Sequence, residues 1–405
     1  LRSMSDNTDL VIAVEEEAII RGKVFVLGQN SNISVQSDQW IYWEGGLETS
    51  GNISFYGGTD TNGVSLDGAN DLGSSVYIHT ISRLVTGQAG TSIEIYGAKD
   101  VDILGSIVAG GSIGDTGVTF SGQDSIVKIV AGEQVYLDTG ILAAKEVELI
   151  GEQGGGGDDN NIGVLVTTGG GVTAAGLTSD GSGGIVRIES GADIWMMGNL
   201  YAGATIELQY DGEGNYIGED VLWTGDAGSR VELQAAGQTL VGGYTIDQDG
   251  DEVEIGGSIR AAQEIQITGS INSSGVGVRV PGSAELVTHN LDGVIRIHAA
   301  GDAEILGLLL AGGEVINEYD AGGNYLGRTS TNFSGDSAIY VRADSQINLG
   351  IDIQAGKMID LVGGLGAASG TSYYPDAGLV LQGSVRLLTW QPNSTININA
   401  PGPIY

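Results

Sequence analysis

Residues 126–149 read IVKIVAGEQVYLDTGILAAKEVEL, and this stretch decides the fold. Val127 and Ile129 alternate with polar or outward-facing residues, which is the pattern of a β-strand. Val147 and Leu149 repeat the pair twenty residues later, with two further short strands between. Such a chain can close a coil and stack on itself, so that each coil buries its apolar side chains against its neighbours. We therefore predict an all-β, single-stranded parallel β-helix (β-solenoid) with about 20 residues in each regular coil.

The same pattern recurs along the chain. Two ungapped copies, two looser copies and one partial copy stand at 185–208, 338–361, 92–115, 294–317 and 253–267. The twenty-residue step predicts that Val186 lies beside Ile206 and that Ile339 lies beside Ile359. The copies thus predict that one coil type is used throughout the central part of the chain.

An alanine column accompanies the apolar pairs. Its members are Ala109, Ala143, Ala202, Ala261, Ala311 and Ala355, and the next residue is always glycine or alanine. A corner where the chain turns sharply against the coil below has room for a methyl group and often needs positive φ. The column therefore predicts a tight corner at the same place in every copy.

Composition and charge exclude several functional classes. The chain of 405 residues has 51 acidic and 16 basic residues, a net charge of −35, and no cysteine. Nucleic acid is excluded as a partner because phosphate binding needs Lys and Arg. The absence of cysteine excludes disulfides and thiolate metal sites. No run of eighteen apolar residues is present, so we expect no membrane insertion. An acidic, cysteine-free repeat chain is compatible with a secreted bacterial protein.

Regular blocks and variable segments divide the chain into three parts. We expect irregular N-terminal coils or a cap at 1–91, a regular β-solenoid with insertions at 92–378, and terminal coils at 379–405. The variable segments all leave the pattern after the fourth strand pair of a block, which predicts loop insertions along one edge of the solenoid. Repeat proteins commonly place their binding surfaces on such insertions.

Two insertions resemble each other, YDGEGNYIG at Tyr210–Gly218 and YDAGGNYLG at Tyr319–Gly327. Asp and Gly-Asn between flanking tyrosines predict a hairpin with a tight turn. One interpretation is an aromatic platform for a glycan or protein partner, and the other is that the tyrosines pack the hairpin onto the solenoid. The platform would comprise Tyr210, Tyr216, Trp223, Tyr319, Tyr325 and Phe333.

A calcium site is the one metal site that the sequence suggests. Asp247, Asp249 and Asp251 alternate around a glycine turn as DQDGD and offer three oxygen ligands to Ca²⁺. The alternative is a plain acidic turn, since the later bidentate Glu of an EF-hand is absent. We expect no cofactor to be required.

The repeat itself resembles a known family. Glycine, an aliphatic residue and Ala-Gly recur in GSIVAGGSI (Gly105–Ile113), GNLYAGATIEL (Gly198–Leu208) and GLLLAGGEV (Gly307–Val315). This repeat pattern resembles the shaft repeats of filamentous-haemagglutinin-type large exoproteins and adhesins. The resemblance implies a right-handed parallel β-helix that serves as an adhesive or structural shaft on the outside or surface of a bacterium. Partners would be copies of the chain, end to end or side by side, or host and cell-surface glycans.

The alternative function is a β-helical polysaccharide lyase or glycoside hydrolase. The stretch Gly156–Asp159, GGDD, resembles a fragment of a polygalacturonase, and hydrolysis needs paired carboxylates. The companion Gly-His-Gly and Arg-x-Lys motifs are missing, so Asp158 and Asp159 are interpreted as turn residues. We therefore assign no catalytic residue and expect a protein that is not an enzyme.

Overall fold

A computed structural model describes eleven stretches of the chain. They are residues 1–58, 74–114, 117–151, 161–210, 216–224, 227–246, 252–271, 274–319, 325–332, 335–364 and 377–405. The regular structure of these stretches consists of β-strands without a helix. The chain forms two compact units, Leu1–Ala227 (unit 1) and Gly228–Tyr405 (unit 2).

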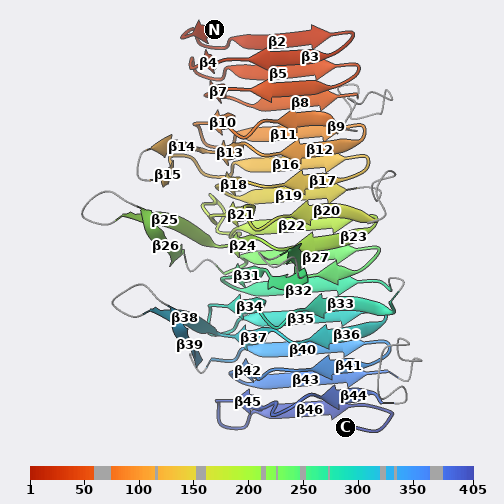
Figure 1. The fold of residues 1–405 in the computed structure, drawn as a ribbon. Coiled ribbons are helices and arrows are strands. Elements are labelled where there is room, and N and C mark those ends of the chain that lie inside the picture. The colour runs from red at the N-terminus through yellow and green to blue at the C-terminus, as the bar shows by residue number, and fades with distance from the viewer. Residues whose placement is uncertain are drawn as a thin grey trace. The chain divides into compact units, whose positions relative to one another are not determined.

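Three stacks of parallel strands build unit 1, and the chain visits sheets B, C and A in turn (Figure 1). Sheet A contains β1 (Arg2–Ser3), β4 (Val24–Val26), β7 (Gly46–Thr49), β10 (Arg83–Thr86), β13 (Ser106–Ala109), β18 (Gly140–Ala143), β21 (Gly171–Ala174) and β24 (Asn199–Ala202). Sheet B contains β2 (Asp9–Val14), β5 (Asn32–Ser37), β8 (Ile53–Gly57), β11 (Ser92–Gly97), β16 (Ile126–Ala131), β19 (Glu146–Gly151) and β22 (Ile185–Ser190). Sheet C contains β3 (Ala18–Arg21), β6 (Ile41–Glu44), β9 (Ser74–Ile78), β12 (Asp100–Ile103), β17 (Val135–Leu137), β20 (Ile162–Val166) and β23 (Asp193–Met196).

Unit 2 repeats this arrangement. Its sheet A contains β31 (Ser258–Ala261), β34 (Glu285–Thr288), β37 (Leu308–Ala311), β42 (Ile353–Ala355) and β45 (Leu387–Thr389). Its sheet B contains β27 (Arg230–Ala235), β32 (Glu264–Gly269), β35 (Val294–Ala299), β40 (Ala338–Ala343), β43 (Met358–Gly363) and β46 (Thr395–Asn399). Its sheet C contains β28 (Thr239–Leu240), β33 (Val276–Val280), β36 (Asp302–Ile305), β41 (Ile347–Leu349) and β44 (Leu379–Leu381). Both units are therefore β-solenoids, as the repeats predict.

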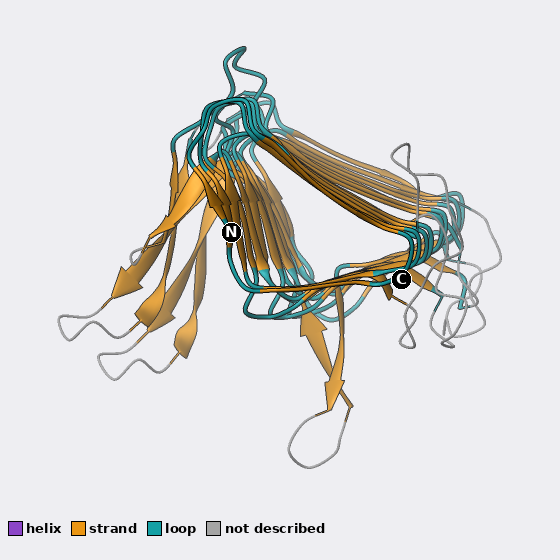
Figure 2. Cartoon of the chain, turned by 90° about the horizontal axis from the view of Figure 1, so that it is seen from above, coloured by secondary structure: helices purple, strands orange, loops and turns teal. Residues whose placement is uncertain are grey.

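The core of each unit lies between the three sheets, which enclose it like the sides of a triangle (Figure 2). The inward-facing side chains of one strand stack on those of the next, so Ile93 lies beside Val127 and Val127 beside Val147. All three are fully buried. In the first coils of unit 1 the rings of Trp43 and Phe55 meet edge to face, with ring centroids 5.5 Å apart. Apolar columns therefore fill the coil, and each strand is covered by its neighbours.

The predicted twenty-residue register is correct in two copies of the repeat and wrong in the copy at 185–208. Val127 pairs with Val147, and Ile339 pairs with Ile359, each over the predicted twenty residues. Ile206 does not pair with Val186, because it belongs to an antiparallel hairpin in which its partner is Val221. The ends of the copies at 92–115 and 294–317, and the start of the copy at 253–267, likewise lie in hairpins.

In the described stretches four antiparallel hairpins leave the coils, and they do not all leave at one edge (Figure 2). Three of them follow a sheet A strand: β14–β15 (Gly111–Gly114, Gly117–Phe120), β25–β26 (Ala204–Tyr210, Tyr216–Trp223) and β38–β39 (Gly313–Tyr319, Tyr325–Asn332). The fourth, β29–β30 (Gly242–Ile246, Glu252–Gly256), lies between a sheet C strand and the next sheet A strand. The prediction of insertions along a single edge is therefore wrong, because glycine allows the chain to leave at a second corner, where Gly242 has φ +159°.

The alanine column forms the predicted corner, and all six of its members are fully buried. The residue that follows has positive φ only where a hairpin begins, at Gly110 (+77°), Gly203 (+77°) and Gly312 (+70°). Where the chain passes directly from sheet A to sheet B, as at Ala144, no such conformation is needed. Three glycines in this column therefore mark the exits of hairpins, whereas Gly356, which has no positive φ, leads directly from β42 to β43.

Strands within 1–91 share sheets with later strands, since β8 pairs with β11 and β10 with β13. The contacts divide the chain after Ala227 instead. The division into 1–91, 92–378 and 379–405 stays a prediction.

Candidate functional site

The hairpins carry most of the residues predicted to bind a partner. Tyr210 pairs with Tyr216 at the far end of β25–β26, and Tyr319 pairs with Tyr325 in the same place on β38–β39. The two predicted hairpins are therefore confirmed, with both tyrosines of each at its tip. The side chains of these four tyrosines lie outside the described residues, and so does Phe333.

Trp223 lies at the opposite end of its hairpin. It pairs with Ala204 at the base of β25–β26, where the strands join the coil, and its side chain is half-buried. The length of β26 separates Trp223 from Tyr216, and the aromatic platform stays a prediction.

The predicted calcium loop, Asp247, Asp249 and Asp251, lies outside the described residues between β29 and β30, as do Asp158 and Asp159. Within the stretches that are described, no three His, Cys, Asp or Glu side chains are grouped so as to hold a metal ion. The described part of the chain also contains no helix with the length and apolarity that a membrane crossing requires.

A second, smaller core anchors the hairpin β38–β39 in unit 2. Val287 and Leu310 point outward from sheet A, and Val315 of β38 packs on them together with Leu308 and Ile351. Val287, Leu310 and Val315 are at most 6% exposed. Burying one such side chain contributes about 1.5–3 kcal/mol. The base of this hairpin is therefore held firmly on the outer face of the sheet.

Hairpin β14–β15 packs on sheet A of unit 1 in a similar way. Val108 faces outward from β13 and is nevertheless fully buried. A methyl group built at Gly111 of β14 would lie 3.2 Å from Val108 Cγ1 and 3.4 Å from Phe120 Cδ1. Hairpin and sheet are thus in close contact, and the outer face of sheet A is a second packing surface.

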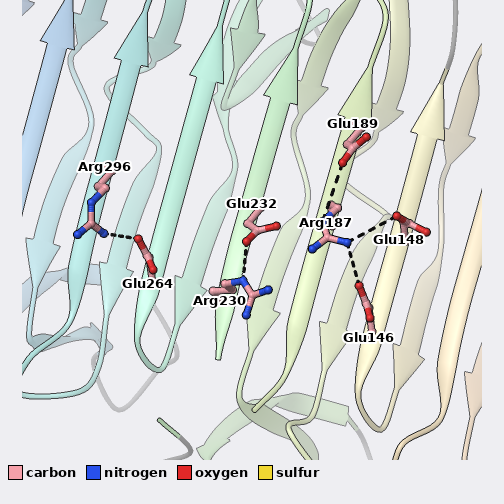
Figure 3. Close-up of polar contacts among 8 residues, drawn as sticks. All are labelled: Glu146, Glu148, Arg187, Glu189, Arg230, Glu232, Glu264 and Arg296. Carbon is pink, nitrogen blue, oxygen red and sulfur yellow. Dashed lines mark hydrogen bonds and ion pairs between the residues drawn. The ribbon is translucent and has the colours of Figure 1, made fainter. Parts of the chain in front are cut away.

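Ion pairs cover the outer face of sheet B (Figure 3). In unit 1, Arg187 Nη1 lies 3.3 Å from Glu146 and 3.7 Å from Glu148, and Lys128 Nζ lies 2.6 Å from Glu148. In unit 2, Arg230 pairs with Glu232, and Arg296 with Glu264. Like charges on neighbouring strands repel, and interleaved cations relieve that repulsion. Because these side chains are partly exposed, each pair contributes at most about 1 kcal/mol.

The outer face of sheet C in unit 1 combines tyrosines and carboxylates. The rings of Tyr42 and Tyr77 stack with centroids 5.5 Å apart, and Asp102 lies next to Tyr77 and accepts a hydrogen bond from Ser74. Burial raises the pKa of Asp102, and burial also raises the pKa of Asp100 to about 6. A carboxyl group with a raised pKa is what general acid catalysis needs.

A repeated hydrogen-bond ladder explains the position of Asp100 without catalysis. Its carboxylate accepts a bond of 2.8 Å from the backbone N–H of Gln134, whose side-chain amide donates to the carbonyl of Ile162 at 2.9 Å. The same ladder recurs in unit 2 through Asp302, Gln346 and Ala377. Recurrence at equivalent corners of the coil favours a structural role for these carboxylates.

Sequence reasoning missed this ladder, the ion pairs and the anchoring core. The available signal was the column that each residue occupies once the coils are aligned, since Asp100 and Asp302 both begin a sheet C strand. No protein-family model, curated protein or solved structure matches the chain.

Proposed function

We propose that the chain is a structural and adhesive segment of an extracellular or cell-surface bacterial protein, a shaft that displays hairpins to binding partners. The solenoid would be right-handed with about 20 residues in its regular coils, as in the family that the repeats resemble. The observation that carries the proposal is the set of three hairpins that leave after a sheet A strand, each beginning behind a buried Ala-Gly corner.

The scaffold suits this role because its stability is local. Each coil is held by backbone hydrogen bonds and apolar columns to its two neighbours, so the coils below a hairpin do not depend on its sequence. The tips of the hairpins are then free to vary, while the bases stay anchored as Val315 is on Leu310.

Glycans or further copies of the chain are the proposed partners. The net charge of −35 keeps the chain soluble and favours cations over anionic polymers as general surface ligands. Ca²⁺ at Asp247, Asp249 and Asp251 would be an optional ligand rather than a required one.

The test removes one hairpin and measures binding. Deleting residues 313–336 joins Gly312 to Ser337, which reproduces the length of the direct link Ala355–Gly356–Lys357 between β42 and β43 and keeps the buried Ser337. We expect the variant to keep its β-sheet circular dichroism and to lose adhesion to cell-surface glycans on an array. A second variant, Tyr319→Ser with Tyr325→Ser, tests the tip side chains alone.

Two results would overturn the proposal. One is glycan and cell adhesion that survives removal of the hairpins from all three sheet A corners. The other is turnover of a polysaccharide by the intact protein that Asp100→Asn or Asp158→Asn abolishes, since that would make the chain an enzyme.

A further inference from the structure

A small cavity lies on the outer face of sheet A in unit 1, at the edge of hairpin β14–β15. Its volume is about 200 Å³, and its walls come from β4, β7, β10 and β14. The polar and charged groups that line it are Lys23, Glu48, Arg83 and Ser112, and Phe25 contributes an aromatic ring. The cavity has room for one small ligand and is below the range of drug-sized sites.

A glycine forms the floor of this cavity. Gly46 pairs with Arg83 on one side, and the register of Val24 with Leu47 places Lys23 beside it on the other. Strands lie about 4.8 Å apart, so the two cationic residues stand about 10 Å apart with the glycine between them. A methyl group built at Gly46 would meet only Lys23 Cγ, at 3.6 Å. The absence of a side chain at this position therefore opens the space between two positive charges.

The two cations lack ion-pair partners among the described residues, although the chain is strongly acidic. Most other basic side chains of unit 1 lie near carboxylates, as Lys128 and Arg187 do on sheet B. Lys23 and Arg83 are exposed and have no carboxylate oxygen within 4 Å in the part of the chain that the structure describes. A pocket with two unpaired cations attracts an anion even on an acidic surface.

We propose that this pocket binds an acidic monosaccharide unit, a uronic acid. Its carboxylate would lie over Gly46 between Lys23 and Arg83, where charge-assisted hydrogen bonds are strong. Glu48 and Ser112 would accept and donate hydrogen bonds to ring hydroxyls, and Phe25 would contact the apolar C–H face.

The charge balance of the pocket selects the class of anion. Lys23 and Arg83 together with Glu48 give a net charge of +1, which matches one carboxylate. A dianion such as sulfate or hydrogen phosphate would leave the pocket with a net charge of −1 and would offer no C–H face to Phe25. The proposal deepens the glycan-binding part of the proposed function and rests on it for the choice of a sugar.

The test is calorimetric titration of the full chain with glucuronate and galacturonate, with glucose and sulfate as comparison ligands. We expect uronate to bind more tightly than either comparison ligand, and Lys23→Ala or Arg83→Ala to weaken binding about tenfold or more. Gly46→Leu, which fills the floor, should abolish binding.

Matched controls separate the pocket from general effects. Gly140 occupies the same outward column as Gly46 on a later strand, so Gly140→Leu should leave uronate binding unchanged. Lys99, which also has no carboxylate oxygen within 4 Å among the described residues, serves as the charge control through Lys99→Ala.

Three outcomes would overturn the inference: unchanged affinity in Gly46→Leu, glucose binding as tightly as glucuronate, or sulfate binding as tightly as glucuronate. Adhesion to glycans without any uronate binding would overturn the pocket and leave the proposed display function standing. Uronate binding that is lost in Gly46→Leu, in a chain that adheres to no glycan polymer, would support the pocket and count against the display function.

Discussion

The corner at Gly110 gives the sharpest test of the solenoid. Gly110 is buried, follows Ala109 at the end of β13 and has φ +77°, a conformation that lets the chain leave the coil for β14. A methyl group at this position would lie 2.6 Å from Ser125 Oγ and 2.8 Å from Ser125 Cβ. Gly110→Ala therefore strains the backbone and also forces a neighbouring coil to move.

The two effects set the size of the loss. The left-handed conformation costs a residue with a Cβ about 1–2 kcal/mol. Overpacking a filled site costs about 1–3 kcal/mol, and Ser125 cannot move freely because its hydroxyl donates to the carbonyl of Gln88 at 3.0 Å. We expect Gly110→Ala to lower the local free energy of opening by about 2–4 kcal/mol, a large part of what a domain has.

Hydrogen–deuterium exchange with mass spectrometry measures this loss where it occurs. Amides of β13, β14, β15 and β16 should exchange at least about thirtyfold faster in Gly110→Ala, because exchange follows the free energy of local opening. The control is Gly140→Ala, where φ is not positive and the new methyl would lie 3.5 Å from Leu142 Cδ1. Unchanged protection in Gly110→Ala, or equal damage in Gly140→Ala, would refute the reasoning.

Three further predictions concern charge and packing. Burial raises the pKa of Asp100 from 3.8 to about 6, so the wild-type chain loses stability as pH rises through this range. Asp100→Asn keeps an acceptor for the N–H of Gln134. In urea melts it should add about 1 kcal/mol of stability at pH 7.5, after allowance for partial exposure, and little at pH 4. Val315→Asp buries a charge against Leu310 and should release β38–β39 to proteolysis while the coils keep their protection. Arg187→Gln should cost under about 1 kcal/mol at low salt and nothing measurable in 1 M NaCl, because its ion pairs are partly exposed.

The coil could be predicted from the sequence because its signals are local and repeated. Val127 and Val147 mark successive coils, and a corner packed against the coil below takes small residues, mostly alanine, with Thr86 and Thr288 in the same buried column. The error at Ile206 has an equally physical cause. Alternation of apolar and polar residues describes any half-buried strand, and it does not say whether the partner is parallel or antiparallel. The positive φ at Gly203 is what directs the chain into the hairpin instead of the next coil. The sequence shows that a glycine stands there, but it does not show which φ the glycine adopts.

The cavity at Gly46 could not be predicted for a different reason. Lys23, Gly46 and Arg83 are separated by unequal stretches of chain, and the irregular first coils obscure the column that they share. The pocket forms because Gly46 has no side chain, and it attracts anions because no described carboxylate forms an ion pair with Lys23 or Arg83. Sequence patterns report the groups that are present, whereas an open space needs the register of the strands.

Serine side chains explain how a coil survives an inserted hairpin. Ser337 is fully buried where the chain returns from β38–β39, and its hydroxyl donates to the carbonyl of Ala311, where the chain left, at 2.7 Å. The same hydroxyl accepts a hydrogen bond of 2.7 Å from the N–H of Gly356, in the corner of the next coil. The buried Oγ atom of Ser337 thus joins the point where the chain leaves the coil, the point where it returns and the corner of the next coil. Because this junction closes the coil without the hairpin, residues beyond it are free to change, and that freedom is what a shaft with variable binding elements needs.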